Sequence, residues 1–172
     1  MKKLFLALLL SAAALQAQRE GMWQGFDGEW RHVSRQIVAL AEATPPQQFA
    51  WRPAPGVRSF SEVCMHIALT NYELLQATGQ PPKVMPAVDM EKAVTSKAAV
   101  IDWLQRSLDA VAAAHAALPP GALQRKVRID HQNTAVDAVY LRLLVHANEH
   151  MGQLIAYARM NGIVPPWSKP GA

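Results

Sequence analysis

Cysteine is nearly missing from this chain of 172 residues, in which Cys64 stands alone. An internal disulfide is therefore excluded, although an exported protein could have one. Charged residues are also scarce, at 17%, whereas hydrophobic residues make up 51%, and this balance excludes a disordered chain. A chain of this length and apolar content is long enough for one domain with a sizeable core.

Blocks of lysine and arginine are missing as well, and basic residues do not alternate with aromatic ones. The formal net charge of +4 includes Lys2 and Lys3, which lie in a segment that we expect to be removed. Without residues 1–17, the chain has 15 basic and 13 acidic residues, and its net charge is about +2. We therefore expect no nucleic-acid partner.

The first 17 residues have the layout of a secretory signal peptide. Two lysines precede an apolar run from Leu4 to Leu10, and small residues follow the run. The run is too short for a membrane span, and no cysteine follows it that could carry a lipid anchor. We expect cleavage after Ala17, a mature domain over residues 18–172, a periplasmic or secreted location and no stable membrane association after cleavage. An uncleaved anchor is the alternative.

Apolar residues recur every three or four positions in four stretches, which predicts four amphipathic helices. A pair of prolines follows each stretch, and proline stops a helix because it lacks the backbone N–H. The chain shows no convincing strand pattern, although residues 123–130 could form a short extended piece. We therefore expect an all-α four-helix bundle, with helices near residues 23–44, 59–78, 95–118 and 134–161.

Capping signals mark the ends of two of these helices. Ser59 and Glu62 are three residues apart and form a capping-box pattern at the start of the second helix. Thr134 with Asp137 is expected to open the fourth helix. Gly162 stands where a left-handed residue commonly ends a helix, so we expect the fourth helix to end there.

The most informative motif is HANEH, which places His146 and His150 four residues apart on the fourth helix. Residues at this spacing leave the same face of a helix about one turn apart. The neighbouring Leu143, Ala147 and Leu154 indicate that this face points toward the core. Two imidazoles arranged in this way can share one metal ion. A pair of buried structural histidines with partners for both rings is the other interpretation.

A catalytic metal site usually has three protein ligands and one open position. His66, near the apolar face of the second helix, is the best third candidate, although a lone histidine on such a face is more often a hydrogen-bonded core residue. Gln153 lies about one turn beyond His150 and could hold a bound water or a ligand ring. The positions of the remaining three histidines fit a shared site less well: His32, His115 and His131.

Other chemistries have weaker support. The string H-x-x-E-H matches a zinc-protease pattern with Glu149 as the base, but that pattern needs a downstream glutamate ligand, and none of the 22 residues after His150 is acidic. Cys64 lies two residues from His66 and so points to a different face, which favours a buried structural thiol over a nucleophile. Motifs for haem attachment, phosphate-binding glycine loops and serine hydrolases are missing.

Two segments, WRPAPGVRSFSEVCMHIALTNYELL and LLVHANEHMGQLIAYARMNGIVPPWS, resemble the DinB family of the DinB/YfiT-like superfamily. The likeness runs from about Trp23 to Trp167, and the H-x-x-x-H-x-x-Q helix with its Asn-Gly end and Pro-Pro-Trp tail is the most specific part. The resemblance implies an up-down four-helix bundle with an unusual connection, often a homodimer. It also implies a divalent metal, such as zinc, nickel or iron, on three histidines, which by motif are His66, His146 and His150.

The resemblance leaves several functions open. Characterised relatives include thiol S-transferases and mycothiol-dependent isomerases, but low-molecular-weight thiols are mainly cytosolic, so an exported member has an unknown small-molecule substrate. The first interpretation is a metal-dependent transferase or hydrolase with water or thiolate at an open metal position. The alternative is a non-catalytic metal-binding or stress-related bundle of the cell envelope, and the third is a structural bundle with buried histidines. The sequence does not choose between an enzyme and a binding protein.

Overall fold

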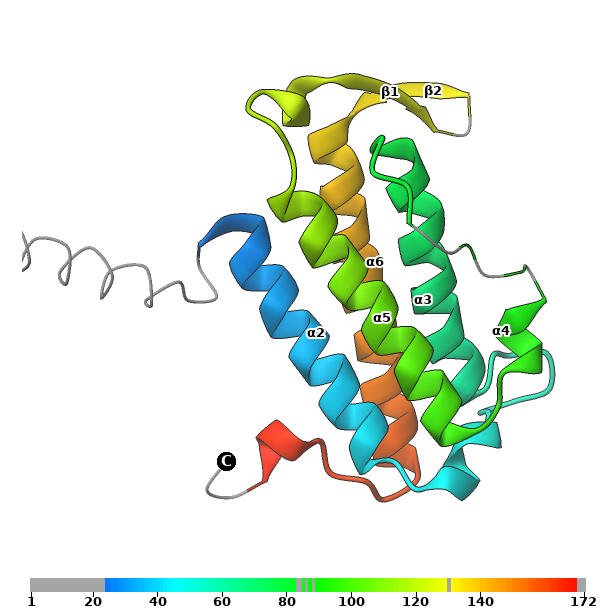
Figure 1. Cartoon of the computed structure of the whole chain (residues 1–172). Helices are drawn as coiled ribbons and strands as arrows, with labels where there is room; N and C mark the ends of the chain where they lie inside the picture. The colour runs from blue at the N-terminus through cyan, green and yellow to red at the C-terminus, as the bar shows by residue number, and fades with distance from the viewer. Residues whose placement is uncertain (1–23, 83–84, 86, 88, 130, 170–172) are drawn as a thin grey trace, which may run out of the picture.

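Four long helices lie side by side in the computed structural model, which describes residues 24–82, 85, 87, 89–129 and 131–169 (Figure 1). The all-α bundle expected from the sequence is thereby confirmed. The expected signal peptide, residues 1–17, and Trp23 lie outside the described residues. The helices are α2 (Gly25–Ala43), α3 (Phe60–Ala77), α5 (Lys97–Ala116) and α6 (Val136–Met160), with the short α4 (Met90–Ala93) between α3 and α5.

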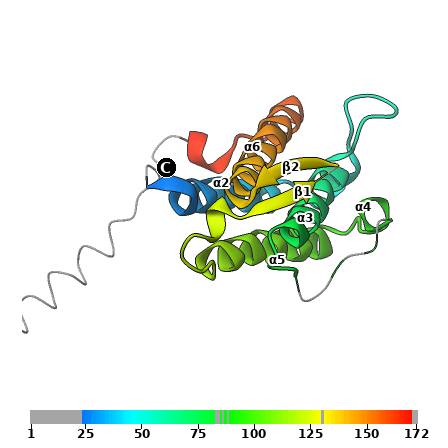
Figure 2. The same cartoon turned by 90° about the horizontal axis from the view of Figure 1, so that it is seen from above.

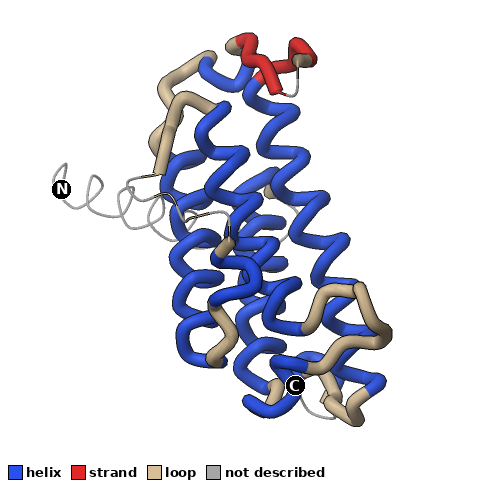
Figure 3. Tube along the Cα trace, turned by 90° about the vertical axis from the view of Figure 1, so that its right-hand side faces the viewer, coloured by secondary structure: helices blue, strands red, loops and turns tan. Residues whose placement is uncertain are grey.

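The order of the helices around the bundle differs from their order in the chain. α2 packs against α5 and α6, and α3 also packs against α5 and α6, so α2 and α3 lie diagonally opposite each other. The 3-10 helix η1 (Pro46–Ala50) lies in the connection between them. α3 ends at one end of the bundle and α5 begins at the other, so the two run in the same direction (Figure 1). Figure 3 shows the long helices alongside one another, with the strands at one end of the bundle. In a simple up-and-down bundle, neighbouring helices alternate in direction, whereas here the neighbours α3 and α5 run the same way.

A β-hairpin covers one end of the bundle, and the sequence analysis did not predict it (Figure 2). β1 (Lys126–Ile129) pairs antiparallel with β2 (Gln132–Ala135). The short extended piece expected over residues 123–130 contains β1. In contrast, β2 reads QNTA, a polar sequence without apolar alternation. Its strand conformation follows from backbone pairing with β1 and not from side-chain pattern.

The expected opening of the last helix at Thr134 is wrong. Thr134 lies in β2 opposite Val127, and α6 begins at Val136 without a capping side chain. Asp137 is nevertheless in the first turn, where a carboxylate interacts favourably with the helix dipole, and it accepts a hydrogen bond from the Ala138 N–H at 2.7 Å. The hairpin sets the start of this helix because pairing with β1 holds the preceding residues extended.

The other two capping predictions are confirmed. The Ser59 hydroxyl accepts from the Glu62 N–H at 3.3 Å, and the Glu62 carboxylate accepts from the Ser59 N–H at 2.8 Å. Gly162 has a φ of +71°, and the Ile163 N–H reaches back to the Ala158 carbonyl at 2.9 Å. This pairing is the Schellman motif, which ends a helix at a left-handed residue.

Apolar stripes from all four long helices meet in the core. The stripe expected on α2 is confirmed, since Trp30, Val33, Ile37 and Leu40 are all buried. The Trp30 indole N–H donates to the Leu108 carbonyl of α5 at 3.0 Å, so the largest core side chain also has its polar atom paired. Among the described residues, no helix has the length and apolar content that a membrane crossing requires.

Candidate metal centre

The three histidines expected to act together meet between α3 and α6. One ring nitrogen from each of His66, His146 and His150 lies within 4.8 Å of the other two. The Nε2 atoms of His66 and His146, 80 residues apart in the chain, are 3.2 Å from each other. His146 and His150 share one face of α6, and α3 packs against α6, so helix packing alone brings the three rings together.

Burial keeps two of the rings in the neutral form that a metal ligand requires. His146 is 5% exposed, and its burial, together with the neighbouring His150 and His66, lowers its pKa to about 4. The pKa of His66 is also lowered, first by burial and then by Arg58, although the Glu91 carboxylate acts in the opposite direction. Both rings therefore keep an unprotonated nitrogen at neutral pH.

Glu91 of α4 determines which nitrogen of His66 carries the hydrogen. Its Oε2 lies 3.1 Å from His66 Nδ1, and an ionised carboxylate can only accept, so Nδ1 is the donor. Burial raises the pKa of Glu91, but its contacts with Arg58 and His66 outweigh that effect and leave the pKa below its usual value. Arg58 Nε donates to the other carboxylate oxygen at 2.7 Å. The lone pair of His66 is thus on Nε2, the nitrogen that faces His146.

A chain of hydrogen bonds orients His150 in the same way. It starts at the Arg58 carbonyl, which can only accept, so the Tyr157 hydroxyl donates to it at 3.1 Å. The Tyr157 oxygen then accepts from Gln153 Nε2 at 2.8 Å. The remaining amide oxygen of Gln153 accepts from His150 Nδ1 at 2.8 Å. The lone pair of His150 is therefore on Nε2, and Gln153 contacts the ring as an acceptor for its outer nitrogen.

His146 differs from the other two because its outer nitrogen is unpaired. Its Nδ1 is buried and has no hydrogen-bond partner among the residues that the structure describes. A buried polar atom without a partner costs about 1–3 kcal/mol, and such atoms recur at catalytic and ion-binding sites. Three imidazoles whose ring nitrogens lie within 4.8 Å of one another are a donor set that suits zinc, nickel or iron.

Two cavities border this cluster, and they reach different parts of it. The first, of about 530 Å³, lies between α3, α6 and the hairpin, and its lining includes the rings of His66 and His146. Apolar side chains such as Leu74 and Val139 make up much of its wall. The second, also about 530 Å³, is lined by Glu91 and Gln153 and does not include the three rings in its lining. Of these two cavities, only the one on the hairpin side is lined by histidines of the cluster.

The alternative residues do not join the cluster. The Glu149 carboxylate accepts a hydrogen bond from Arg142 at 2.8 Å on the exposed side of α6. It therefore does not face the histidine cluster, as the base of a zinc protease would. Cys64 is fully buried, and burial raises the pKa of its thiol, as expected for a structural cysteine. His115 bonds to Asp27 at 2.7 Å, and His131 lies in the hairpin turn with a φ of +66°.

Glu91 is the residue that sequence reasoning missed. It lies 25 residues from His66 in a segment expected to be a loop, and a single acidic residue in a loop carries no signal of its own. Only the placement of α4 against the start of α3 shows its role. Tyr157 was missed for a similar reason, since aromatic residues of an amphipathic helix are normally core residues.

The architecture and the cluster together define a helical bundle with a three-histidine candidate metal centre between two neighbouring helices. A family model described as the DinB superfamily matches residues 29–154. The chain belongs to the DinB superfamily, as its motifs suggested.

Two solved structures have a similar fold. One is a DinB-like protein from Bacillus cereus, with 19% identity and a TM-score of 0.72, over 84% of this chain and 95% of that one. The other is a DinB-like protein from Bacillus subtilis, with 16% identity and a TM-score of 0.64, over 81% of this chain and 93% of that one. A search of curated protein sequences found no match.

Proposed function

We propose that this protein binds a divalent metal ion through His66, His146 and His150 and acts as a metal-dependent transferase or hydrolase on a small molecule. The observation that carries the proposal is the convergence of three ring nitrogens within 4.8 Å of one another. Three imidazoles leave a fourth coordination position for a ligand that is not part of the protein. When bound, the metal would act as a Lewis acid and lower the pKa of a water or thiol ligand.

The protein's own residues support this role in two ways. Glu91 and Gln153 hold the outer nitrogens of two histidines, which directs their lone pairs inward before any ligand arrives. The cavity that reaches His66 and His146 provides room for a substrate next to these rings. This access favours an enzyme over the non-catalytic alternative, because a storage or structural site needs no adjoining cavity.

Metal content per chain is the first test. Untagged protein, purified without chelator, should contain about one equivalent of metal by elemental mass spectrometry, and His150→Ala should contain almost none. His131→Ala is the matched control, because this exposed histidine lies in the hairpin turn. A wild-type protein without metal, even after incubation with zinc, nickel and iron, would contradict the proposal.

The open position has a test of its own. Cobalt(II) can replace the native metal and reports its coordination through visible absorption. Azide should shift this spectrum with saturation if a coordination position is open. A spectrum that stays unchanged at saturating azide would indicate a closed site, as the non-catalytic alternative requires.

We also propose that the mature protein works outside the cytoplasm, on the evidence of its first 17 residues alone. N-terminal sequencing of protein from the cell envelope should begin near Gln18. Intact Met1 in the soluble cytosolic fraction would refute export and would favour transfer of a cytosolic thiol.

A further inference from the structure

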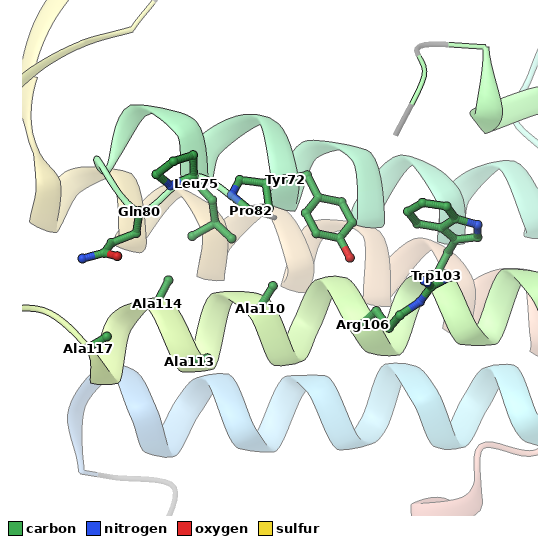
Figure 4. A pocket seen from close by; sticks show the side chains of 11 residues that line it. Tyr72, Leu75, Gln80, Pro82, Trp103, Arg106, Ala110, Ala113, Ala114 and Ala117 are labelled. Atoms are coloured by element: carbon green, nitrogen blue, oxygen red, sulfur yellow. The ribbon is translucent and has the colours of Figure 1, made fainter. Parts of the chain in front are cut away.

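Another cavity lies on the opposite side of α3 from the histidine cluster, between α3 and α5 (Figure 4). This α3–α5 cavity has a volume of about 490 Å³ and shares no lining residue with the histidine cluster or with the two cavities beside it. One wall is an alanine-rich face of α5, and the other is formed by α3 and the two prolines after it. The lining is therefore almost entirely apolar along its length.

Two aromatic rings close one end of the cavity. Tyr72 and Trp103 meet edge to face, with ring centroids 6.2 Å apart and planes at 89°. The Arg106 guanidinium lies 4.5 Å from the centre of the Trp103 ring and also pairs with Asp102. Gln80 lies at the other end of the cavity (Figure 4). Aromatic walls of this kind favour a flat or slender apolar ligand.

Tyr72 is a largely buried residue that presents a polar group to the cavity. The residue is only 6% exposed, yet its hydroxyl forms no hydrogen bond with any residue that the structure describes. Figure 4 shows the oxygen directed into the cavity toward the end that holds Arg106. The oxygen itself is not among the buried unpaired atoms of the structure, so water in the cavity reaches it. A ligand that pairs with this hydroxyl would replace that water.

The charges near the phenol limit what this ligand can be. Burial raises the Tyr72 pKa, and of the nearby charges Arg106 lowers it whereas Asp102 and Asp109 raise it. Arg106 has the largest of these charge effects, but its guanidinium is already paired with Asp102. A cation that is already paired attracts an anionic ligand only weakly, so an uncharged ligand fits this end of the cavity better.

We propose that the α3–α5 cavity binds an uncharged, largely apolar small molecule with one hydroxyl group, of the phenol or alcohol class. The hydroxyl pairs with the Tyr72 oxygen between the aromatic end walls, and the apolar body lies along the alanines of α5. The site works independently of the metal centre, since the two lie on different sides of α3 and share no residue.

Three small probes test the proposal on the full metal-loaded protein. p-Cresol, toluene and p-toluate have nearly the same shape but carry a hydroxyl, no polar group and a carboxylate. Binding is followed by NMR through the indole N–H signal of Trp103. We expect p-cresol to bind with saturation and p-toluate to bind at least about tenfold more weakly.

Variants then locate the contact. Tyr72→Phe should weaken p-cresol about three- to tenfold and leave toluene unchanged, because it removes one hydrogen bond and little volume. Ala110→Phe should weaken both by filling the cavity, whereas Ala98→Phe, on an exposed position of α5, should change neither. Unchanged thermal unfolding of each variant shows that the fold is kept.

Four outcomes would overturn the proposal. The first is a Trp103 signal that does not shift up to the solubility limit of p-cresol. The second is equal binding of p-toluate and p-cresol, and the third is p-cresol binding that Ala110→Phe leaves intact. The fourth is a dimer that Ala110→Phe dissociates in light scattering, which would make this face an interface between two copies of the chain.

Discussion

The two sides of α3 are built from one helix but serve different purposes. On the side toward α5, Leu75 is buried in the core and Asn71 donates to Ser107 of α5 at 3.1 Å. On the side toward α6, His66 lies next to a cavity and bonds to the Glu91 carboxylate, and its Nε2 is 3.2 Å from that of His146. Near these residues the first side contributes packing beneath the α3–α5 cavity, whereas the second side arranges polar groups around the histidine cluster.

The difference teaches how a site is supported on a stable helix. The partners of His66 and His150 both lead back to Arg58, through its guanidinium on one side and its carbonyl on the other. Arg58 immediately precedes the Ser59 cap of α3. The start of the helix and the orientation of two candidate ligands therefore depend on the same short stretch of chain.

The largest expected effect is on the packed side. Leu75→Ala should lower the free energy of unfolding by about 2–5 kcal/mol, because it leaves a cavity where a fully buried side chain was. Metal content should stay at the wild-type level. Leu141→Ala, at an exposed position of α6, is the matched control and should change stability by less than about 0.5 kcal/mol. Loss of metal from folded Leu75→Ala protein would mean that the two sides are not separate.

The next effect is on the ligand side. Glu91→Ala should weaken metal binding about 10- to 100-fold, since His66 loses the acceptor that orients its ring. Glu91→Gln should recover part of this loss, because an amide oxygen can still accept from Nδ1. Competition with a calibrated chelator measures both affinities.

Glu149→Gln is the control for Glu91, because its carboxylate bonds to Arg142 on the exposed side of the same ligand helix. Its metal affinity should match the wild type. Equal affinities for Glu91→Ala and Glu149→Gln would show that Glu91 does not position His66.

Loss of the hydrogen bond from His150 to Gln153 should weaken metal binding less than loss of the bond from His66 to Glu91, because the Gln153 acceptor is a neutral amide. Gln153→Leu should weaken metal binding by about three- to tenfold, the change expected for loss of one neutral hydrogen bond. Tyr157→Phe should have a weaker effect in the same direction, since it acts only through Gln153. If Tyr157→Phe lost more metal affinity than Gln153→Leu, Tyr157 would not be acting on His150 through Gln153.

The smallest effect concerns the cap of α3 and depends on pH. Partial burial raises the pKa of Glu62, but the Ser59 N–H and the Arg52 guanidinium outweigh it and leave the pKa below its usual value. A lowered pKa in the folded state stabilises the protein above the pKa of the unfolded chain, and this contribution is lost as pH falls through the folded-state value.

Glu62→Ala should therefore be about 1 kcal/mol less stable than the wild type near neutral pH. The difference should shrink below about pH 4.5, the usual pKa of this carboxyl group. Denaturant unfolding across this range measures it, and Glu73→Ala, an exposed residue of the same helix, should show no such trend. A difference that grows as pH falls would contradict the sign of the shift.

Much of the fold could be predicted from the sequence because its signals are local. Apolar spacing showed the four long helices, and the capping box at Ser59 and the left-handed Gly162 were confirmed at their ends. The sequence also indicated His66, His146 and His150, two by their spacing and the third by its place near the apolar face of its helix and by family resemblance. Residues on one helix face recur at the spacing of the helix period, so they can be recognised in the sequence.

The tertiary structure decided what depends on contacts between distant segments. β2 exists because its backbone pairs with β1, Glu91 matters because α4 packs near His66, and the diagonal placement of α2 and α3 follows from how the helices share the core. None of these leaves a periodic pattern in the chain. The sequence by itself determined the helices and the residue types of the candidate centre, including Gln153 on the same helix as His150. Packing decided that Glu91 bonds to His66, because only the folded chain brings atoms 25 residues apart within hydrogen-bond distance.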